Sequence, residues 1–308
     1  MAILQNTSIT GSLNLNRAIA GTNQGDMWYD PADGYMKYSS NVWSAGGALI
    51  TARASLAGTG TQNTALAFGS PSCTEEYNGT SWAAGGAMIT GRGASAGTGT
   101  QNEALASGGT GNPNCTEEYN GTSWANGGAL IIGRNTLAGV GIQNATLVFG
   151  GICVFTNVAC TEAYDGTSWS AGGPLITARR GLAGAGTQNA ALAFGGFTPT
   201  CGGSITCTEK YNGSTWSADS ALITSRYLLA GAGTQNAALA FGGENAPSGN
   251  ILSCTESYNG ISWSTNSALI NTITNLAGAG TQNAALAFGG STPTTVSCTE
   301  EYTGTICI

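Results

Sequence analysis

The chain has 308 residues, a formal net charge of −7 and only 8% charged residues, whereas an ordinary soluble domain carries roughly 25%. Its 9 basic residues give no electrostatic footprint for nucleic acid, and no stretch approaches the roughly 20 apolar residues of a membrane-spanning helix. Histidine is absent, which removes the commonest metal ligand and the usual proton-transfer group near neutral pH. We therefore expect no nucleic-acid partner, no membrane insertion, no cofactor and no enzymatic activity.

Residues 1–26 are predicted to form a segment separate from the rest of the chain. The first residues lack the basic and apolar regions of a secretory signal, so we expect no secretion by that route. Ile9, Leu13 and Leu15 alternate with polar residues, which is typical of a half-buried strand. Because this strand is too short to fold alone, we predict that it adds to the sheet of another chain and so anchors the protein.

Residues 27–308 are predicted to form a single domain, most of which is a repeat. Six tryptophans recur at intervals of 39 to 47 residues: Trp43, Trp82, Trp124, Trp169, Trp216 and Trp263. The aromatic slot of the Ala-Phe-Gly segment always lies 25 residues after the tryptophan, with Ser107 filling it in the second unit, and each repeated cysteine lies 9 residues before the next tryptophan. All the length variation therefore falls in one loop per unit, between the aromatic slot and the cysteine.

Each unit contains four short segments with strand character. In the first complete unit these segments are 56–62, 65–69, 73–77 and 82–90. An Asn-Gly link joins the last two, and two-residue links of this kind favour type I′ hairpin turns. Four antiparallel strands repeated six times predict an all-β protein, a six-bladed β-propeller, with the Gly/Ala-rich strand innermost. An extended solenoid is the alternative, which the lack of a polar capping unit disfavours.

The repeat also resembles a known family. The order Leu-Ile-Thr-Ala-Arg, a Gly-rich strand, Ala-Phe-Gly-Gly, a variable loop and Glu-Glu-Tyr-Asn-Gly-Thr-Ser-Trp looks like the kelch repeat of galactose-oxidase-like propellers, over residues 43–308. The resemblance implies the propeller fold, but kelch propellers serve many functions and the fold does not choose among them. The copper site of galactose oxidase has histidine ligands, so that activity is not carried over to a chain without histidine.

A second resemblance lies near the N-terminus. The stretches Gly25-Asp-Met-Trp-Tyr-Asp, Gly34-Tyr-Met-Lys-Tyr and Asn41-Val-Trp are similar to segments of tail-fibre and other virion proteins of tailed phages. This resemblance implies a virion protein that is assembled in the host cytoplasm and released by lysis. It further implies a homo-oligomer or several copies on the particle, attached to other virion proteins through residues 1–26.

The sequence leaves open how the ring closes. Residues 298–308 read as a blade strand followed by a truncated hairpin partner, which the strand at Trp43 could complete. However, Tyr38 and Trp43 have the same spacing as Tyr77 and Trp82, so residues 34–43 also resemble such a hairpin. One of the two hairpins is surplus.

Most charges of the repeat occupy fixed slots. An arginine follows five of the six outer strands, at Arg53, Arg92, Arg134, Arg179 and Arg226, and Ile273 takes the sixth slot. A glutamate lies two residues after each repeated cysteine, at Glu75, Glu117, Glu162, Glu209, Glu256 and Glu300. We predict partly buried, bidentate Arg–carboxylate pairs with a structural role, because catalytic groups rarely repeat six times around a ring.

Six cysteines recur once per unit and are predicted to be small packing residues: Cys73, Cys115, Cys160, Cys207, Cys254 and Cys298. Spread around a ring, they form no metal site. Three further cysteines suggest disulfides that staple two long loops and the C-terminus. The hypothetical pairs are Cys153 with Cys160, Cys201 with Cys207, and Cys298 with Cys307.

The six variable loops are the candidate recognition surface. In a four-stranded blade the second-to-third and fourth-to-first links lie on one rim, so these loops should share a face, and loops on a rigid scaffold commonly carry recognition. Their amides, hydroxyls and aromatics suit binding of a neutral sugar. The candidate ligand-binding residues are Asn112, Asn114, Phe155, Asn157, Phe197, Thr198, Asn245, Asn250, Thr292 and Thr294. The alternative is that the loops merely tolerate insertion. The repeated Gln-Asn pairs should ring the opposite rim in a geometric or docking role.

These observations together predict a non-enzymatic virion structural protein that adheres to a host-surface glycan, of the tail-fibre or receptor-binding type. A capsid or tail decoration protein is the alternative, and a glycan hydrolase is a third. Six-bladed sialidases carry Asp-box turns similar to Asp165-Gly-Thr-Ser-Trp, but the initial Ser-x-Asp of that box is missing from the repeats. The periodic charges also provide no distinctive acid with a base or nucleophile.

Overall fold

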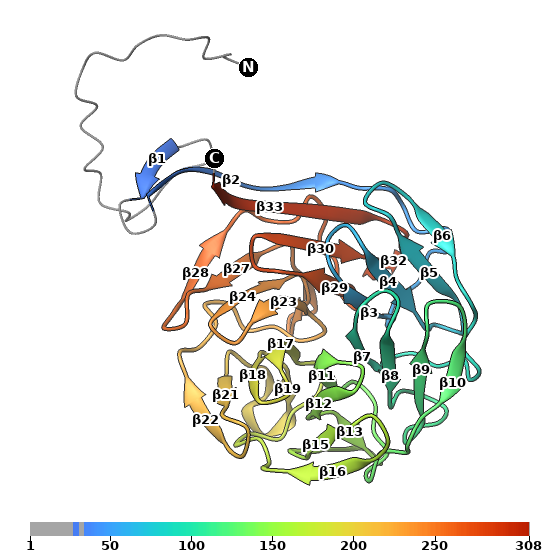
Figure 1. Cartoon of the computed structure of the whole chain (residues 1–308). Coiled ribbons are helices and arrows are strands. Elements are labelled where there is room, and N and C mark those ends of the chain that lie inside the picture. The colour runs from blue at the N-terminus through green and yellow to red at the C-terminus, as the bar shows by residue number, and fades with distance from the viewer. Residues whose placement is uncertain (1–26, 31–33, 308) are drawn as a thin grey trace, which may run out of the picture.

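The computed structural model describes residues 27–30 and 34–307, which form a six-bladed β-propeller of four-stranded antiparallel blades (Figure 1). The inner strands of neighbouring blades contact one another around the whole ring, including the last blade with the first. The predicted fold is therefore confirmed, and the solenoid alternative is wrong.

Each blade runs from an inner strand at the axis to an outer strand at the edge. In that order, the first blade contains β3 (Ala57–Gly60), β4 (Ala65–Phe68), β5 (Thr74–Tyr77) and β6 (Trp82–Ala84). The second contains β7 (Ala96–Gly99), β8 (Ala104–Ser107), β9 (Thr116–Tyr119) and β10 (Trp124–Asn126). The third contains β11 (Ala138–Ile142), β12 (Ala145–Phe149), β15 (Thr161–Tyr164) and β16 (Trp169–Gly172).

The fourth blade contains β17 (Ala183–Thr187), β18 (Ala190–Phe194), β21 (Thr208–Tyr211) and β22 (Trp216–Asp219). The fifth contains β23 (Ala230–Thr234), β24 (Ala237–Phe241), β27 (Thr255–Tyr258) and β28 (Trp263–Asn266). The sixth contains β29 (Ala277–Gly280), β30 (Ala284–Phe288), β33 (Thr299–Cys307) and β2 (Tyr35–Ala45), with β1 (Met27–Asp30) as an added outer strand.

The two ends of the chain close the ring within the sixth blade. Strand β2 pairs antiparallel with the last strand β33, with Trp43 opposite Tyr302, and the two strands run side by side in Figure 1. Because β2 continues through a bulge between Ser39 and Val42, Tyr38 and Trp43 lie in one strand and form no hairpin. The C-terminal stretch is likewise one continuous strand, so neither predicted hairpin exists.

Glycine and alanine form the inner strands because neighbouring blades approach too closely there for larger side chains. A Cβ atom on Gly231 would lie 2.7 Å from Phe194 Cζ and 2.9 Å from the carbonyl oxygen of Gly184, both in the fourth blade. Atoms at such separations overlap, so the close packing of the interior requires glycine at this position.

Aromatic contacts join most neighbouring blades. The ring centroid of Trp124 lies 4.9 Å from that of Phe68 in the preceding blade, and Trp124 Nε1 donates a hydrogen bond to Thr74 Oγ1 of the same blade as Phe68. Equivalent Trp–Thr bonds occur at all six tryptophans of the repeat. In the second blade the aromatic slot holds the buried Ser107, whose hydroxyl has no hydrogen-bond partner.

The repeated Gln-Asn segments lie on the rim opposite the variable loops and clamp each blade to the preceding one. Gln188 Nε2, for example, donates to the carbonyl oxygens of Thr146 and Tyr164, both in the third blade. The same pair of bonds is made by Gln62, Gln101, Gln143, Gln235 and Gln282. The geometric role predicted for these pairs is confirmed for the glutamines.

The predicted Arg–Glu pairs exist, are fully buried and have a different geometry from the expected one. Each arginine contacts only Oε1 of its glutamate, as Arg92 does with Glu117 at 2.7 Å. Both carboxylate oxygens also accept backbone N–H groups, in this pair from Ile89 at 2.8 Å and Thr90 at 3.1 Å. The pairs are therefore monodentate, because each glutamate also fixes the link between two blades.

The Asn-Gly hairpins are tight but are not two-residue type I′ turns. Tyr77 pairs with Trp82, so four residues, 78–81, form the connection. Asn78 Oδ1 accepts the backbone N–H groups of Thr80 and Ser81 at 3.0 and 2.9 Å. Only Gly79 has a positive φ, 88°. A type I′ turn needs two residues with positive φ, whereas this turn has one and is stabilised by hydrogen bonds to the asparagine side chain.

The disulfide hypothesis is wrong for the cysteines that the structure describes. Cys153, Cys160, Cys201 and Cys207 are free thiols, as is Cys298. Cys153 lies in a small hairpin, where it pairs with Thr156. Cys298 immediately precedes β33, and Cys307 is the last residue of that strand. At about 3.3 Å per residue the backbones of the two cysteines are roughly 30 Å apart. A disulfide cannot span that distance.

Candidate functional site

One rim of the propeller carries both the variable loops and the links between blades; we call it the variable-loop face. Isolated backbone bridges join link to loop at Asn135–Ile152, Arg180–Phe197, Tyr227–Glu244 and Thr274–Ser291. Four loops form short hairpins: β13 (Ile152–Cys153) with β14 (Thr156–Asn157), β19 (Phe197–Thr198) with β20 (Gly203–Ser204), β25 (Glu244–Asn245) with β26 (Asn250–Ile251), and β31 (Ser291–Thr292) with β32 (Thr294–Thr295). The predicted shared face is therefore present.

Sequence differences between the repeats also concentrate at two consecutive positions of the links, directly after the arginine slot. The first link position holds six different residues: Ala54, Gly93, Asn135, Arg180, Tyr227 and Thr274. The second link position again holds six: Ser55, Ala94, Thr136, Gly181, Leu228 and Asn275. Two residues further along, the pattern Ala-Gly-x-Gly-x-Gln-Asn is common to all six units.

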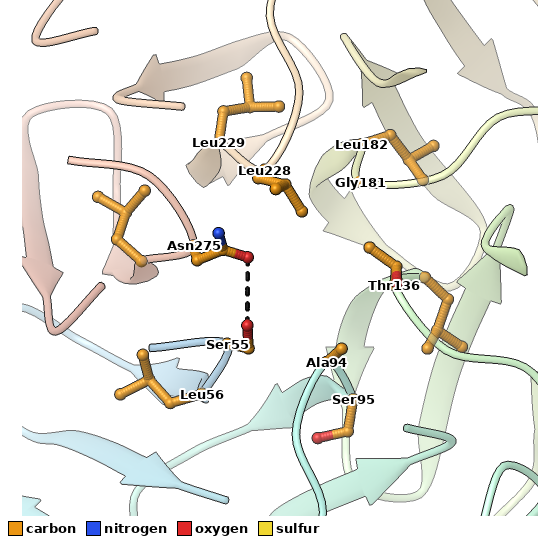
Figure 2. A pocket seen from close by; sticks show the side chains of 12 residues that line it. Ser55, Leu56, Ala94, Ser95, Thr136, Gly181, Leu182, Leu228, Leu229 and Asn275 are labelled. Atoms are coloured by element: carbon orange, nitrogen blue, oxygen red, sulfur yellow. Dashed lines mark hydrogen bonds between the residues drawn. The ribbon is translucent and has the colours of Figure 1, made fainter. Parts of the chain in front are cut away.

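The residues at the second link position form a closed ring around the propeller axis (Figure 2). The backbone N–H of each donates to the carbonyl oxygen of its counterpart in the preceding blade, over distances of 2.7 to 3.0 Å, and Asn275 and Ser55 complete the circle. Ser55 Oγ also bonds to Asn275 Oδ1 at 3.2 Å. Inside the ring lies a pocket of about 110 Å³, with five leucines and Ser95 behind the ring residues.

All six ring residues have left-handed backbone geometry, with φ between 52° and 61°. For a residue with a Cβ atom this conformation costs roughly 1 kcal/mol. Glycine would remove that cost, yet it occurs only once, at Gly181. Strained residues of this kind cluster at functional sites, and five of the six residues at the mouth of the pocket carry a side chain despite the backbone preference.

A charged and aromatic cluster extends from the ring across the third, fourth and fifth blades; we call it the Arg180 cluster. The guanidinium carbon of Arg180 lies 4.5 Å from the ring centroid of Phe197, and Arg180 NH1 donates to Asn157 Oδ1 at 3.1 Å. The Phe197 and Tyr227 ring centroids are 5.3 Å apart. The backbones of Tyr227 and Glu244 in turn exchange two N–H to carbonyl hydrogen bonds, at 3.0 and 2.9 Å. Three blades thus contribute to a single continuous group.

The electrostatics of the cluster keep Tyr227 a hydrogen-bond donor. Burial is the main cause that raises the pKa of its phenol to about 12, and the hydrogen bond to Glu244 adds to the rise. Asn157 fixes the other end, because its Nδ2 donates to the carbonyl oxygen of Phe197 at 2.8 Å while its Oδ1 accepts Arg180. The five side chains are therefore held in place and only partly buried.

The β13–β14 hairpin, which contributes Asn157 to this cluster, projects two large apolar side chains from its tip into solvent. Val154 is 84% exposed and Phe155 is 96% exposed, and their φ values are 44° and 68°. Both residues of the two-residue turn are thus left-handed, a geometry that usually recruits Asn-Gly. A β-branched residue in this conformation is a steric outlier, and the exposed pair gains no burial in return.

The ten predicted ligand-binding residues divide into two groups. Asn112, Asn114, Phe155, Asn250 and Thr294 are exposed. Asn157, Phe197, Asn245 and Thr292 are partly buried, and Thr198 is only 2% exposed. Asn245 Nδ2 donates to both the carbonyl and the hydroxyl oxygen of Ser225 at 2.8 Å. Thr198 is thus buried in this structure, because its strand packs this side chain inward.

Arg180, Tyr227, Glu244 and the ring around the axis were not predicted from the loop sequences. The signal was present in the sequence, because Arg180 is the one propeller arginine outside the repeated slot. The two variable link positions could have been found by aligning the units on that slot. Their proximity to the loops depends on blade geometry. Ile9, Leu13 and Leu15, predicted to anchor the chain, lie outside the described residues.

The same face also carries a repeated apolar feature. Six isoleucines in equivalent link positions are 55–62% exposed: Ile50, Ile89, Ile131, Ile176, Ile223 and Ile270. The backbone N–H of each donates to the repeated glutamate of the following blade, as Ile176 does to Glu209 at 2.7 Å. The isoleucine is the same in all six units, whereas the two link positions that follow the arginine slot differ in each unit. The six isoleucines therefore form a uniform ring.

Within the residues that the structure describes, no group of three or more Cys, Asp or Glu side chains is arranged to hold a metal ion. No helix in that part of the chain is long and apolar enough to cross a bilayer. No family model and no curated protein matches this chain. Support for a function therefore comes from the fold and from the geometry of the variable-loop face.

Proposed function

We propose that the protein is a non-enzymatic adhesin that binds glycan on a host surface through its variable-loop face. The observation that carries the proposal is the distribution of differences between nearly identical repeats. Loop length, loop sequence and the two link positions all vary on that one face. On the opposite rim, the Gln-Asn pair is the same in all six units.

The fold itself explains why this distribution is informative. Each blade needs the same clamping glutamine, the same Trp–Thr bond and the same small inner residues to fit its neighbours, so these positions resist change. Positions that the ring does not constrain are free to diverge. When such positions gather on one accessible face of a rigid scaffold, they form a recognition surface of the kind that loops commonly provide.

The chemistry of the face suits a sugar better than a strongly charged partner. Exposed amides such as Asn112 and Asn250 can hydrogen-bond to hydroxyl groups, and exposed aromatics such as Phe155 can stack on the apolar face of a sugar ring. The predicted candidates Asn114 and Thr294 are also exposed on these loops.

The proposed setting is the virion of a tailed phage. Its support is the similarity of the stretches around residues 25–43 to virion proteins and of the propeller to kelch repeats. Residues 1–26, with Ile9, Leu13 and Leu15, would attach the chain to other virion proteins, and several copies would act together on the particle.

Binding of the purified full-length chain to an array of bacterial surface polysaccharides tests the proposal. We expect selective binding, weakened by Phe155→Ala and by Asn250→Ala without loss of folding. Thr80→Ala, an exposed change in a turn on the opposite rim, is the matched control. Absence of binding to every polysaccharide, or equal weakening by the control, would contradict the proposal.

The uniform isoleucine ring favours a second candidate, a decoration protein that docks on a symmetric partner. A partner with repeated contacts would select the same apolar residue in every blade, as is seen at the six isoleucines. Antibody labelling of intact particles separates the two candidates. Label at tail or fibre tips supports adhesion. Label over the capsid, lost when Ile89, Ile176 and Ile223 are changed to Asn, supports decoration.

A further inference from the structure

The basic side chains of the propeller are almost all neutralised within the protein. Among the residues that the structure describes, the five slot arginines are buried against the repeated glutamates, and Lys210 pairs with Asp219 at 3.0 Å. Arg180 forms no ion pair with any carboxylate in that part of the chain. In a protein of net charge −7, one half-buried and unneutralised cation on the variable face is a specific feature.

No other repeat carries a basic residue at the position equivalent to Arg180. The same link position holds Ala54, Gly93, Asn135, Tyr227 and Thr274 in the other five units. The fold therefore does not require an arginine there. The side chain is nevertheless held in place by Phe197 below its guanidinium plane and by Asn157 at NH1.

The guanidinium retains donors for an external acceptor. It carries five N–H donors in a fixed fork that matches a carboxylate, and one bond to Asn157 uses only NH1. Partial burial over an aromatic ring lowers the local dielectric constant, which strengthens a contact with an anion relative to the same contact in water. Gly181, the next residue, leaves the pocket wall beside Arg180 without a side chain.

We propose that the Arg180 cluster binds the carboxylate of an acidic sugar residue, with neighbouring neutral sugars seated toward the axial pocket. This inference rests on the proposed glycan adhesion and names the ligand class. The surrounding groups suit a saccharide: the Tyr227 phenol and the Glu244 carboxylate offer partners for hydroxyls, and Phe155 lies two residues from Asn157 on the same hairpin.

The isolation of the cation decides between classes of anionic ligand. A nucleic acid or another dense polyanion needs several basic contacts, and no second unneutralised cation accompanies Arg180 among the described side chains of this face. One cation among amides, hydroxyls and aromatics matches a ligand with isolated negative charges between neutral, hydroxyl-rich units. A glycan in which uronic acids alternate with neutral sugars has this pattern.

The experiment measures binding of the full-length protein to an array with three sets of spots: oligosaccharides that contain uronic or sialic acid, the same oligosaccharides with methyl-esterified carboxylates, and acidic peptides. We expect binding to acidic oligosaccharides, loss on esterification, and weaker binding as salt is raised from 0.05 to about 0.5 M, because salt screens charge contacts. Arg180→Gln should weaken binding about 10- to 100-fold, in line with loss of a charge-assisted hydrogen bond.

Two further variants locate the effect. Arg180→Lys, which keeps the charge but loses the fork, should retain part of the affinity. Thr80→Gln introduces the same amide on the exposed opposite rim and should leave binding unchanged, with unchanged circular dichroism in every variant. Binding that is indifferent to esterification and to Arg180→Gln would overturn this inference and leave glycan adhesion standing. Binding to acidic peptides alone, or to no spot, would overturn both.

Discussion

Replacement of a buried arginine by the residue of the sixth blade tests the role of the Arg–Glu pairs. Arg226 is fully buried, and its NH2 group lies 3.0 Å from Glu256 Oε1. In Arg226→Ile, the buried carboxylate keeps the backbone N–H groups of Ile223 and Thr224 at 2.7 and 3.1 Å but loses its counter-charge. Removing one partner of a buried pair costs about 3–5 kcal/mol. Because the two backbone hydrogen bonds still stabilise the carboxylate, we expect the free energy of unfolding to fall by about 3 kcal/mol, the lower end of this range.

The sixth blade shows how the fold tolerates isoleucine in this slot. There, Asn271 supplies both its backbone N–H and its Nδ2 group to Glu300 Oε1, at 3.1 and 3.0 Å. Asn271 corresponds to Thr224, so the double variant Thr224→Asn with Arg226→Ile reproduces that blade. We expect it to recover at least about 1.5 kcal/mol, since a hydrogen bond to a charged group contributes about 1.5–3 kcal/mol.

Urea unfolding, followed by tryptophan fluorescence, gives the free energy of unfolding of each variant. Lys210→Met removes the partly exposed pair with Asp219 and serves as the control, with an expected loss below about 1 kcal/mol. If Arg226→Ile were as stable as the wild-type protein, or if Thr224→Asn gave no recovery, the assignment of Glu256 as a charge-balanced anchor of the link would be wrong.

Three further predictions concern packing and pH. Gly231→Ala should destabilise the protein by about 1–3 kcal/mol through overlap with Phe194, and a stability equal to wild type in urea would contradict the close approach of the inner strands. Ser107→Phe should raise the melting temperature, because it restores the aromatic opposite Trp169 and removes an unpartnered buried hydroxyl; a lower melting temperature would show that the slot has closed. Five tyrosines have pKa values raised to about 12, chiefly by burial, from an ordinary value of 10.0: Tyr77, Tyr119, Tyr164, Tyr227 and Tyr302. Because the raised folded-state pKa stabilises the protein fully below the unfolded value, the free energy of unfolding should decline between about pH 10 and 12, and urea titrations that show no decline there would refute this.

Each repeated unit has two sets of positions, one that packs neighbouring blades together and one on the variable-loop face. Positions that join neighbouring blades are uniform: the Gln188 clamp and the Trp124–Thr74 bond recur in every unit. The two link positions beside the loops and the axial pocket, represented by Arg180 and Leu228, differ in every unit. A recognition surface can therefore diverge in its side chains, because at the second link position the contacts between blades are hydrogen bonds of the backbone.

The sequence by itself determined the blade number, the order of strands and the variable face. Regular spacing of Trp, Cys and Gly was sufficient, because each blade must repeat the same contacts with its neighbours. The sequence also determined that the slot arginines pair with glutamates. Its local turn and disulfide hypotheses failed, since Asn78 organises a four-residue turn and Cys298 and Cys307 lie at opposite ends of one strand.

Only the tertiary structure decided the ring closure and the composition of the candidate site. The pairing of β2 with β33 joins residues more than 250 positions apart, as between Trp43 and Tyr302. The sequence shows similar hairpin patterns at both ends of the repeat, so it could not indicate which segments pair to close the ring. The Arg180 cluster likewise unites three blades. Local patterns report the structure of one unit. Contacts between units depend on the curvature of the closed ring, which brings together side chains that the sequence keeps apart.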